Sequence, residues 1–131
     1  MKATTESHYA NILTTALEGG LHYVDLARSG YKWYEPGPYG GGSADPAPNG
    51  GGNVVCTLLD FNETDENDNP AEFSVTLATV SKASGILAKR AAESRYAKYL
   101  LSVIRDPDSD YDWDDAFNIL QYGVFGELVY G

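Results

Sequence analysis

The chain has few of the residues that build covalent or metal-based sites. Among its 131 residues are one cysteine, one methionine and two histidines. The single cysteine, Cys56, excludes an internal disulfide, and its place in the apolar run Val54–Leu59 predicts a buried thiol. His8 and His22 have no cysteine or histidine partner at ligand spacing, so we expect no zinc site.

Long hydrophobic runs are also missing. None of the apolar stretches approaches the roughly 20 residues that a membrane-spanning helix needs. No apolar segment follows Met1, so we expect neither a signal peptide nor a membrane partner. Together with the lone cysteine, this favours a reducing cytoplasm.

No complete catalytic motif is present. The glycine runs Gly40–Gly42 and Gly50–Gly52 are not followed by the Lys-Ser/Thr pair of a phosphate loop. The aspartates after Arg105 lack the glycine and glutamate that a calcium-binding EF-hand loop requires. We therefore expect a non-enzymatic protein with no catalytic residue, metal or cofactor.

Hydrophobic periodicity predicts a single α+β domain over residues 1–131, interrupted by a Gly/Pro-rich loop at about 35–53. We expect about four helices, packed mainly on one face of a small antiparallel or mixed sheet of about four to five strands. The helices are predicted from Thr5 or Ser7 to Glu18, from Thr79 or Ser81 to Arg90, from Glu93 to Ile104, and from about Asp112 to a stop at Gly123. The strands are predicted at Asn53–Phe61 (the central one), Glu72–Leu77 and Val124–Tyr130, with one or two short strands within 21–34.

Charge is distributed very unevenly along the chain. The net charge is −10 and the pI is near 4.4, which argues against direct nucleic-acid binding. Residues 79–105 nevertheless carry six basic residues and one acidic residue. Such a basic island in an acidic protein attracts anions or an acidic partner.

Two groups of residues suggest a ligand site. Aromatic side chains crowd beside the glycine-rich loop, where they can stack on a base, and the basic residues can bind phosphate. A solvated helix face and an aromatic dimer interface are the alternative interpretations. The predicted ligand-binding residues are Glu18, Tyr31, Trp33, Tyr34, Lys89, Arg90, Arg95 and Lys98.

The segments Leu13–Gly20 (LTTALEGG) and Gln121–Gly131 (QYGVFGELVYG), with a Trp/Tyr-rich stretch between them, resemble a family of small uncharacterised proteins of tailed bacteriophages. The resemblance implies a viral accessory protein that acts in the host bacterial cytoplasm. Small phage accessory proteins often counter host defence, either by sequestering signalling nucleotides or by imitating DNA. The family has no established activity and therefore transfers no functional residues.

Three functions follow from these observations. The first is a non-catalytic counter-defence protein that sequesters a small anionic, nucleotide-derived ligand, with a homo-oligomer forming the pocket. The second is an acidic inhibitor that binds a host defence enzyme through carboxylates at Asp60–Glu72 and Asp106–Asp115, in the manner of a DNA mimic. The third is a minor virion or assembly component.

Overall fold

The computed structural model describes residues 3–19, 21, 25–29 and 54–130. These contain the helices α1 (Ala3–Glu18), α2 (Leu77–Arg90), α3 (Arg95–Arg105) and α4 (Trp113–Phe125), and the strands β1 (Leu26–Ser29), β2 (Val54–Thr64) and β3 (Pro70–Thr76). The α+β class and the four helices are confirmed. The described part contains three strands rather than the expected four to five. The loop at 35–53 and the second short strand expected within 21–34 lie outside the described residues, whereas β1 corresponds to the first.

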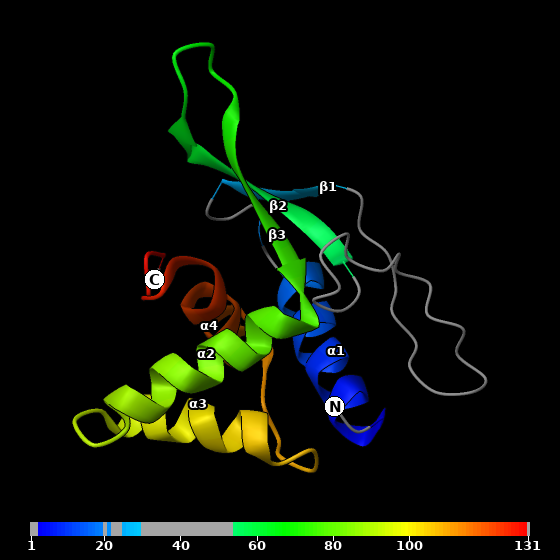
Figure 1. Ribbon diagram of the computed structural model, residues 1–131, viewed down its shortest axis with the longest axis vertical. Helices are drawn as coiled ribbons and strands as arrows, with labels where there is room; N and C mark the ends of the chain where they lie inside the picture. Colours follow the sequence, from blue (N-terminus) through cyan, green and yellow to red (C-terminus); the bar gives the residue numbers. More distant parts are fainter. Residues whose placement is uncertain (1–2, 20, 22–24, 30–53, 131) are drawn as a thin grey trace.

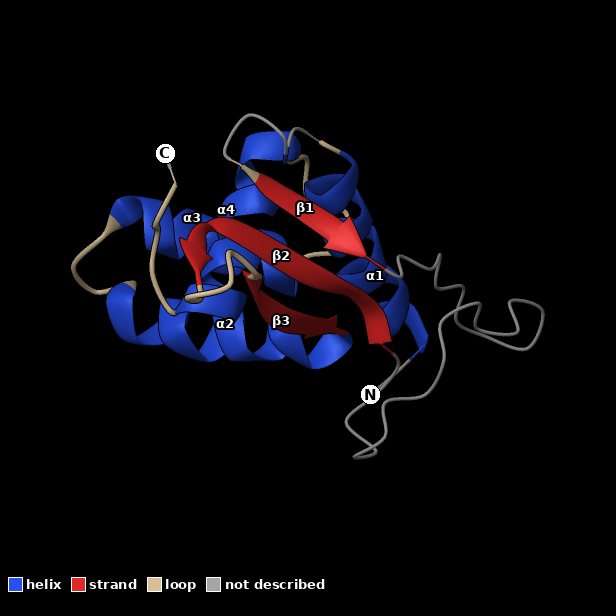
Figure 2. Cartoon of the chain, turned by 90° about the horizontal axis from the view of Figure 1, so that it is seen from above, coloured by secondary structure: helices blue, strands red, loops and turns tan. Residues whose placement is uncertain are grey.

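The sheet is antiparallel, with the order β1-β2-β3, so β2 is central as predicted. Leu58 pairs with Phe73 and Asp60 with Ala71, which places these residues on one face. Figures 1 and 2 show all four helices on that side of the sheet, so the described residues form two layers. The β2–β3 hairpin extends beyond the helices (Figure 1).

The tip of this hairpin is a turn organised by Asp65. Its carboxylate accepts hydrogen bonds from the backbone N–H groups of Asn67 (2.8 Å) and Asn69 (2.9 Å). Asp68 adopts a left-handed conformation with φ 62°, which aspartate tolerates better than most residues. The central strand was predicted to end at Phe61, but β2 continues to Thr64 before the turn.

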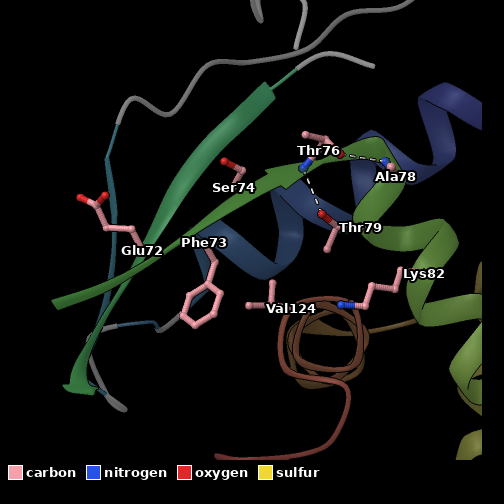
Figure 3. A pocket seen from close by; sticks show the side chains of 9 residues that line it. Glu72, Phe73, Ser74, Thr76, Ala78, Thr79, Lys82 and Val124 are labelled. Carbon is pink, nitrogen blue, oxygen red and sulfur yellow. Dashed lines mark hydrogen bonds between the residues drawn. The ribbon is translucent and has the colours of Figure 1, made fainter. Parts of the chain in front are cut away.

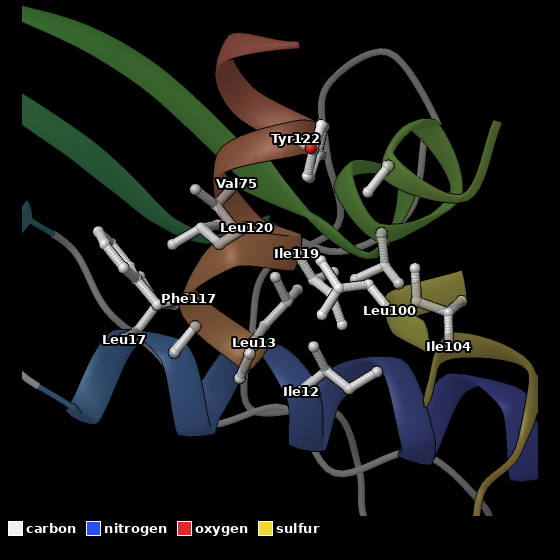
Figure 4. Close-up of a cluster of buried hydrophobic side chains, with 14 of the residues drawn as sticks. Ile12, Leu13, Leu17, Val75, Leu100, Ile104, Phe117, Ile119, Leu120 and Tyr122 are labelled. Atoms are coloured by element: carbon white, nitrogen blue, oxygen red, sulfur yellow. The ribbon is translucent and has the colours of Figure 1, made fainter. Parts of the chain in front are cut away.

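The core lies between the sheet and the helices (Figure 4). The predicted apolar stripe of α1 contributes Ile12 and Leu13, both 0% exposed, and α4 contributes Ile119 and Leu120 opposite them. Burying each such side chain stabilises the fold by roughly 1.5–3 kcal/mol. His8 is also buried on α1, and its Nε2 donates to the carbonyl oxygen of Val103 on α3 at 2.7 Å.

Helices α2 and α4 cross at a glycine. Gly123 was expected to end the last helix, but the helix continues through it to Phe125. A β-carbon at Gly123 would collide with the Thr79 carbonyl oxygen and would lie 2.6 Å from its Cγ2 atom. Glycine is therefore required for close helix packing here, and Gly126, with φ 80°, supplies the left-handed cap that ends α4.

The final strand predicted at Val124–Tyr130 is not formed. Val124 and Phe125 complete α4, and residues 128–130 pack as an irregular segment held by the buried side chain of Gln121. The Gln121 Oε1 atom accepts from the N–H groups of Val129 (2.8 Å) and Tyr130 (2.7 Å), and its Nε2 donates to the Tyr130 carbonyl (2.8 Å). The Gln121 side chain thus makes the backbone hydrogen bonds that a neighbouring strand would otherwise make.

Candidate anion-binding site

The basic residues of the sequence meet in a helical hairpin formed by α2 and α3. Thr76 caps α2 through a reciprocal hydrogen-bond pair with Thr79, so the helix begins at Leu77 rather than at Thr79 or Ser81. The carbonyl oxygen of Arg90 accepts hydrogen bonds from the N–H groups of Glu93 and Ser94, both at 3.0 Å, and these bonds form the turn that follows α2. Ser94 then caps α3 by accepting from the N–H of Ala97 at 3.1 Å.

This turn brings four of the predicted ligand-binding residues to one end of the hairpin. Lys89 and Arg90 finish α2, Arg95 and Lys98 begin α3, and all four are exposed. The Arg90 guanidinium lies over the Tyr122 ring of α4, 5.6 Å from its centroid, in a cation–π contact. Lys89, Arg95 and Lys98 have no such contact within the described residues.

A groove of about 640 Å³ runs between the end of α2 and the exposed side of α3. Its apolar part consists of small residues of α2 and the turn, together with Leu101. Lys98 and Arg105, seven positions apart and therefore on one helix face, line its α3 side with the Ser102 hydroxyl between them. The groove thus combines two cations with an apolar floor, and Asp106 limits it at one end.

The cations of the hairpin are not neutralised by the protein's own acids. Within the described part of the chain, no ion pair joins a carboxylate to Lys82, Lys89, Arg90, Arg95, Lys98 or Arg105. This is notable because the protein has 19 acidic residues and only 9 basic ones. The hairpin therefore presents positive charge that is available to an external anion.

A second concavity of about 420 Å³ lies between β3, the start of α2 and α4. Figure 3 shows Lys82 extending from α2 toward Val124, with Phe73 beside them. Glu72 also lines the rim, so this concavity has charges of both signs. It is separate from the groove, which lies toward the other end of α2.

The remaining predicted site residues are not next to the four cations. Tyr31, Trp33 and Tyr34 lie outside the described residues. Glu18 is exposed at the end of α1, which finishes beside the sheet in Figure 1, whereas the α2–α3 turn lies on the opposite side of the molecule. The structure therefore brings together the basic half of the predicted site.

Two aromatic residues beside the cations were not recognised from the sequence. Helical spacing within the predicted helix from Glu93 to Ile104 predicts that Tyr96 and Tyr99 lie on its apolar side, but they are 38% and 40% exposed. Both hydroxyls donate to the Asp115 carboxylate of α4, at 3.2 Å from Tyr96 and 2.8 Å from Tyr99. This hydrogen bond, with partial desolvation and nearby carboxylates, raises the pKa of Tyr99 to about 12, so the phenol stays protonated.

These tyrosines begin a hydrogen-bonded chain that ends in the sheet. Asn118 donates to the Tyr96 hydroxyl at 2.7 Å, and Gln121 donates to Asn118 at 3.0 Å. Gln121 binds the backbone of Tyr130, whose own hydroxyl donates to Asp60 of β2 at 2.6 Å. Helix α4 and Tyr130 thus connect the surface of α3 to the central strand through a chain of hydrogen bonds.

The residues considered for covalent or metal chemistry are not arranged for it in the described structure. Cys56 is 0% exposed, as predicted, and burial raises the pKa of its thiol to about 11, which suppresses the reactive thiolate. Among the described residues, no group of three or more His, Cys, Asp or Glu side chains is placed to hold a metal ion. None of the described helices is long and apolar enough to cross a bilayer.

The most prominent chemical feature of the described residues is therefore a basic helical hairpin with an open groove and two adjoining tyrosines. Comparisons with models of protein families, with curated proteins and with solved structures found no match to this chain.

Proposed function

We propose that this is a non-catalytic binding protein that holds a small phosphate-bearing ligand on the basic face of the α2–α3 hairpin. One observation carries the proposal. The hairpin keeps six cations without carboxylate partners in the described structure of a protein whose net charge is −10. An anionic ligand would supply the negative charge that these cations lack as partners. Arginine and lysine are the side chains best suited to bind phosphate.

The groove supports a small ligand rather than an extended one. Its volume of about 640 Å³ falls within the range of small-molecule sites. Lys98 and Arg105 would contact phosphate oxygens, while Leu101 and the alanines of the floor would contact the carbon atoms of the sugar. A nucleotide-derived molecule has both parts.

The biological role that we propose is counter-defence. The resemblance to phage accessory proteins suggests a viral protein that withdraws a signalling nucleotide in the host bacterial cytoplasm. Because the groove is open on one side, tight sequestration would need a second copy of the chain to cover the ligand. We therefore propose a homo-oligomer, whose mass can be measured by light scattering with and without ligand.

Isothermal titration against ribose 5-phosphate, cyclic dinucleotides and ADP-ribose-type nucleotides tests the proposal. Replacing both Lys98 and Arg105 by alanine should weaken binding by at least about 10-fold, because a charge-assisted hydrogen bond contributes roughly 1.5–3 kcal/mol. Lys82→Ala is the matched control, since Lys82 belongs to the same basic island but lines the other concavity. Equal losses in both variants would indicate a diffuse charge effect, and no heat with any ligand would refute the proposal.

A second candidate function rests on the β2–β3 hairpin. Its far end stands clear of the helices (Figure 1) and exposes Glu63, Asp65, Glu66 and Asp68. These carboxylates are spaced along an exposed hairpin that would fit the basic surface of a host enzyme in the manner of a DNA mimic. Charge reversal of Glu63, Glu66 and Asp68 should then abolish salt-sensitive capture of a DNA-binding nuclease, while the variant of Lys98 and Arg105 should not.

A further inference from the structure

The exposed side of α3 carries a pair of stacked aromatic rings. Tyr96 and Tyr99 are one helical turn apart, their ring centroids are 6.1 Å apart and their planes are inclined by 25°. Both side chains remain about two-fifths exposed. Two adjoining rings on a solvent-facing helix offer an aromatic surface on which a planar group can stack.

The rings are held in place before any ligand arrives. Asp115 accepts hydrogen bonds from both hydroxyls, and Asn118 donates to Tyr96. Asp115 is itself fixed, because it belongs to the capping box at the start of α4. A surface that is ordered in advance loses little conformational entropy when a ligand stacks on it.

Charges of both signs lie near the aromatic pair. Arg95 lies one helical turn before both Lys98 and Tyr99 and therefore adjoins each of them, whereas Lys98 and Tyr99 are consecutive residues that point in different directions around α3. Asp112, the N-cap of α4, lies beside Asp115 at the hydroxyl end of the rings, because its Oδ1 atom accepts from the Asp115 N–H at 3.0 Å and its own N–H donates to Asp115 Oδ2 at 3.4 Å. The aromatic pair therefore has carboxylates at its hydroxyl end and cations on the helix that carries it.

We propose that this surface binds the base of a nucleotide whose phosphate is held by Arg95 and Lys98. The base stacks on Tyr99, and its N–H groups face the carboxylate of Asp112. The inference rests on the proposed function, because Lys98 serves the phosphate in both. The ligand is of mononucleotide size, since further phosphates of a longer strand would meet the acidic segment from Asp106 to Asp110.

Titrations with adenosine 5′-monophosphate, ribose 5-phosphate and adenosine test the base and phosphate contributions separately. In the wild-type protein, the nucleotide should bind about 5- to 150-fold more tightly than ribose 5-phosphate, the range expected for stacking of one base. Tyr99→Ala should abolish this difference and leave the affinity for ribose 5-phosphate within twofold. Tyr99→Phe, which keeps the ring, should retain most of the difference.

Phe61→Ala is the control, because Phe61 is exposed on β2 and belongs to another element. It should change neither affinity. Upfield shifts of the adenine H2 and H8 resonances provide a readout of stacking in the unmodified protein.

Three results would overturn the inference. If ribose 5-phosphate and the nucleotide bind equally, the base has no site, although the proposed function stands. If neither binds, both proposals fail. If a ten-nucleotide adenine strand binds more than tenfold tighter than the mononucleotide, the surface takes single-stranded nucleic acid instead.

Discussion

The hydroxyl of Tyr130 donates a 2.6 Å hydrogen bond to the carboxylate of Asp60, although the two residues are 70 positions apart. Asp60 is 1% exposed on the central strand and also accepts from the N–H of Asn62 at 3.0 Å. A buried carboxylate is costly unless it is hydrogen-bonded, so Tyr130 contributes directly to the stability of the sheet.

Tyr130→Phe should therefore lower the free energy of unfolding by about 1–3 kcal/mol, because it removes one of the two hydrogen bonds that the Oδ1 atom of the buried Asp60 carboxylate accepts. Urea denaturation followed by circular dichroism measures the change. Tyr99→Phe removes a similar hydroxyl–carboxylate bond at an exposed site and should cost less. Equal costs would show that burial of Asp60 is not what makes the bond important.

Gln121→Leu should release the segment that precedes Tyr130. The substitution keeps the approximate volume but removes every hydrogen bond that Gln121 makes to the backbone of Val129 and Tyr130. We expect the free energy of unfolding to fall by about 1–3 kcal/mol, and hydrogen exchange to become faster at the backbone amides of Val129 and Tyr130. Unchanged exchange would mean that packing alone orders this segment.

Two glycines should respond to alanine in opposite directions. Gly123→Ala places a methyl group against Thr79 and should destabilise the protein by about 1–3 kcal/mol through overpacking. Gly85→Ala meets nothing within 4 Å on the exposed side of α2 and should stabilise it by about 0.5–1 kcal/mol. Thermal unfolding of the two variants gives the sign of each change in stability. Stabilisation by Gly123→Ala would contradict the close approach of Thr79, and destabilisation by Gly85→Ala would contradict the open space at Gly85.

Alkaline pH should weaken the fold partly through Cys56. The ordinary pKa of this thiol is 9.0, and burial raises it to about 11 in the folded protein. Below pH 9 the thiol is protonated in both states; between pH 9 and 11 the unfolded state loses the proton first, so stability falls as pH rises. Comparison of urea midpoints at pH 8 and 10.5 should show a smaller decrease for Cys56→Ala than for the wild type. The wild-type thiol should also react with a disulfide reagent only at the rate of unfolding.

The elements that were predicted correctly depend on local patterns. The spacing of Ile12 and Leu13, the apolar run around Cys56 and the alternation through Phe73 and Val75 each specify an element and its buried face. By contrast, Val124–Tyr130 has the composition of a strand, but its outcome depends on Gln121 and on the close approach of α2 at Gly123. Neither contact is visible in a local pattern.

The same distinction applies to the candidate site. Lys89, Arg90, Arg95 and Lys98 could be grouped from their spacing, because one short turn joins their helices. Tyr96 and Tyr99 were assigned to the interior, since helical periodicity places them beside Leu100 and Val103. Their exposure is coupled to Asp115, which lies on another helix, and sequence spacing contains no information about that pairing.

The hydrogen bonds from Gln121 to the backbone of Val129 and Tyr130 also affect aggregation at high protein concentration. The stretch from Leu128 to Tyr130 is apolar and strand-like, and Leu128 and Val129 are 42% and 49% exposed. While Gln121 occupies the amides of Val129 and Tyr130, these groups are unavailable for β-type pairing with another molecule. A variant that lacks these hydrogen bonds gains an aggregation-prone segment, so its shelf life in solution should shorten.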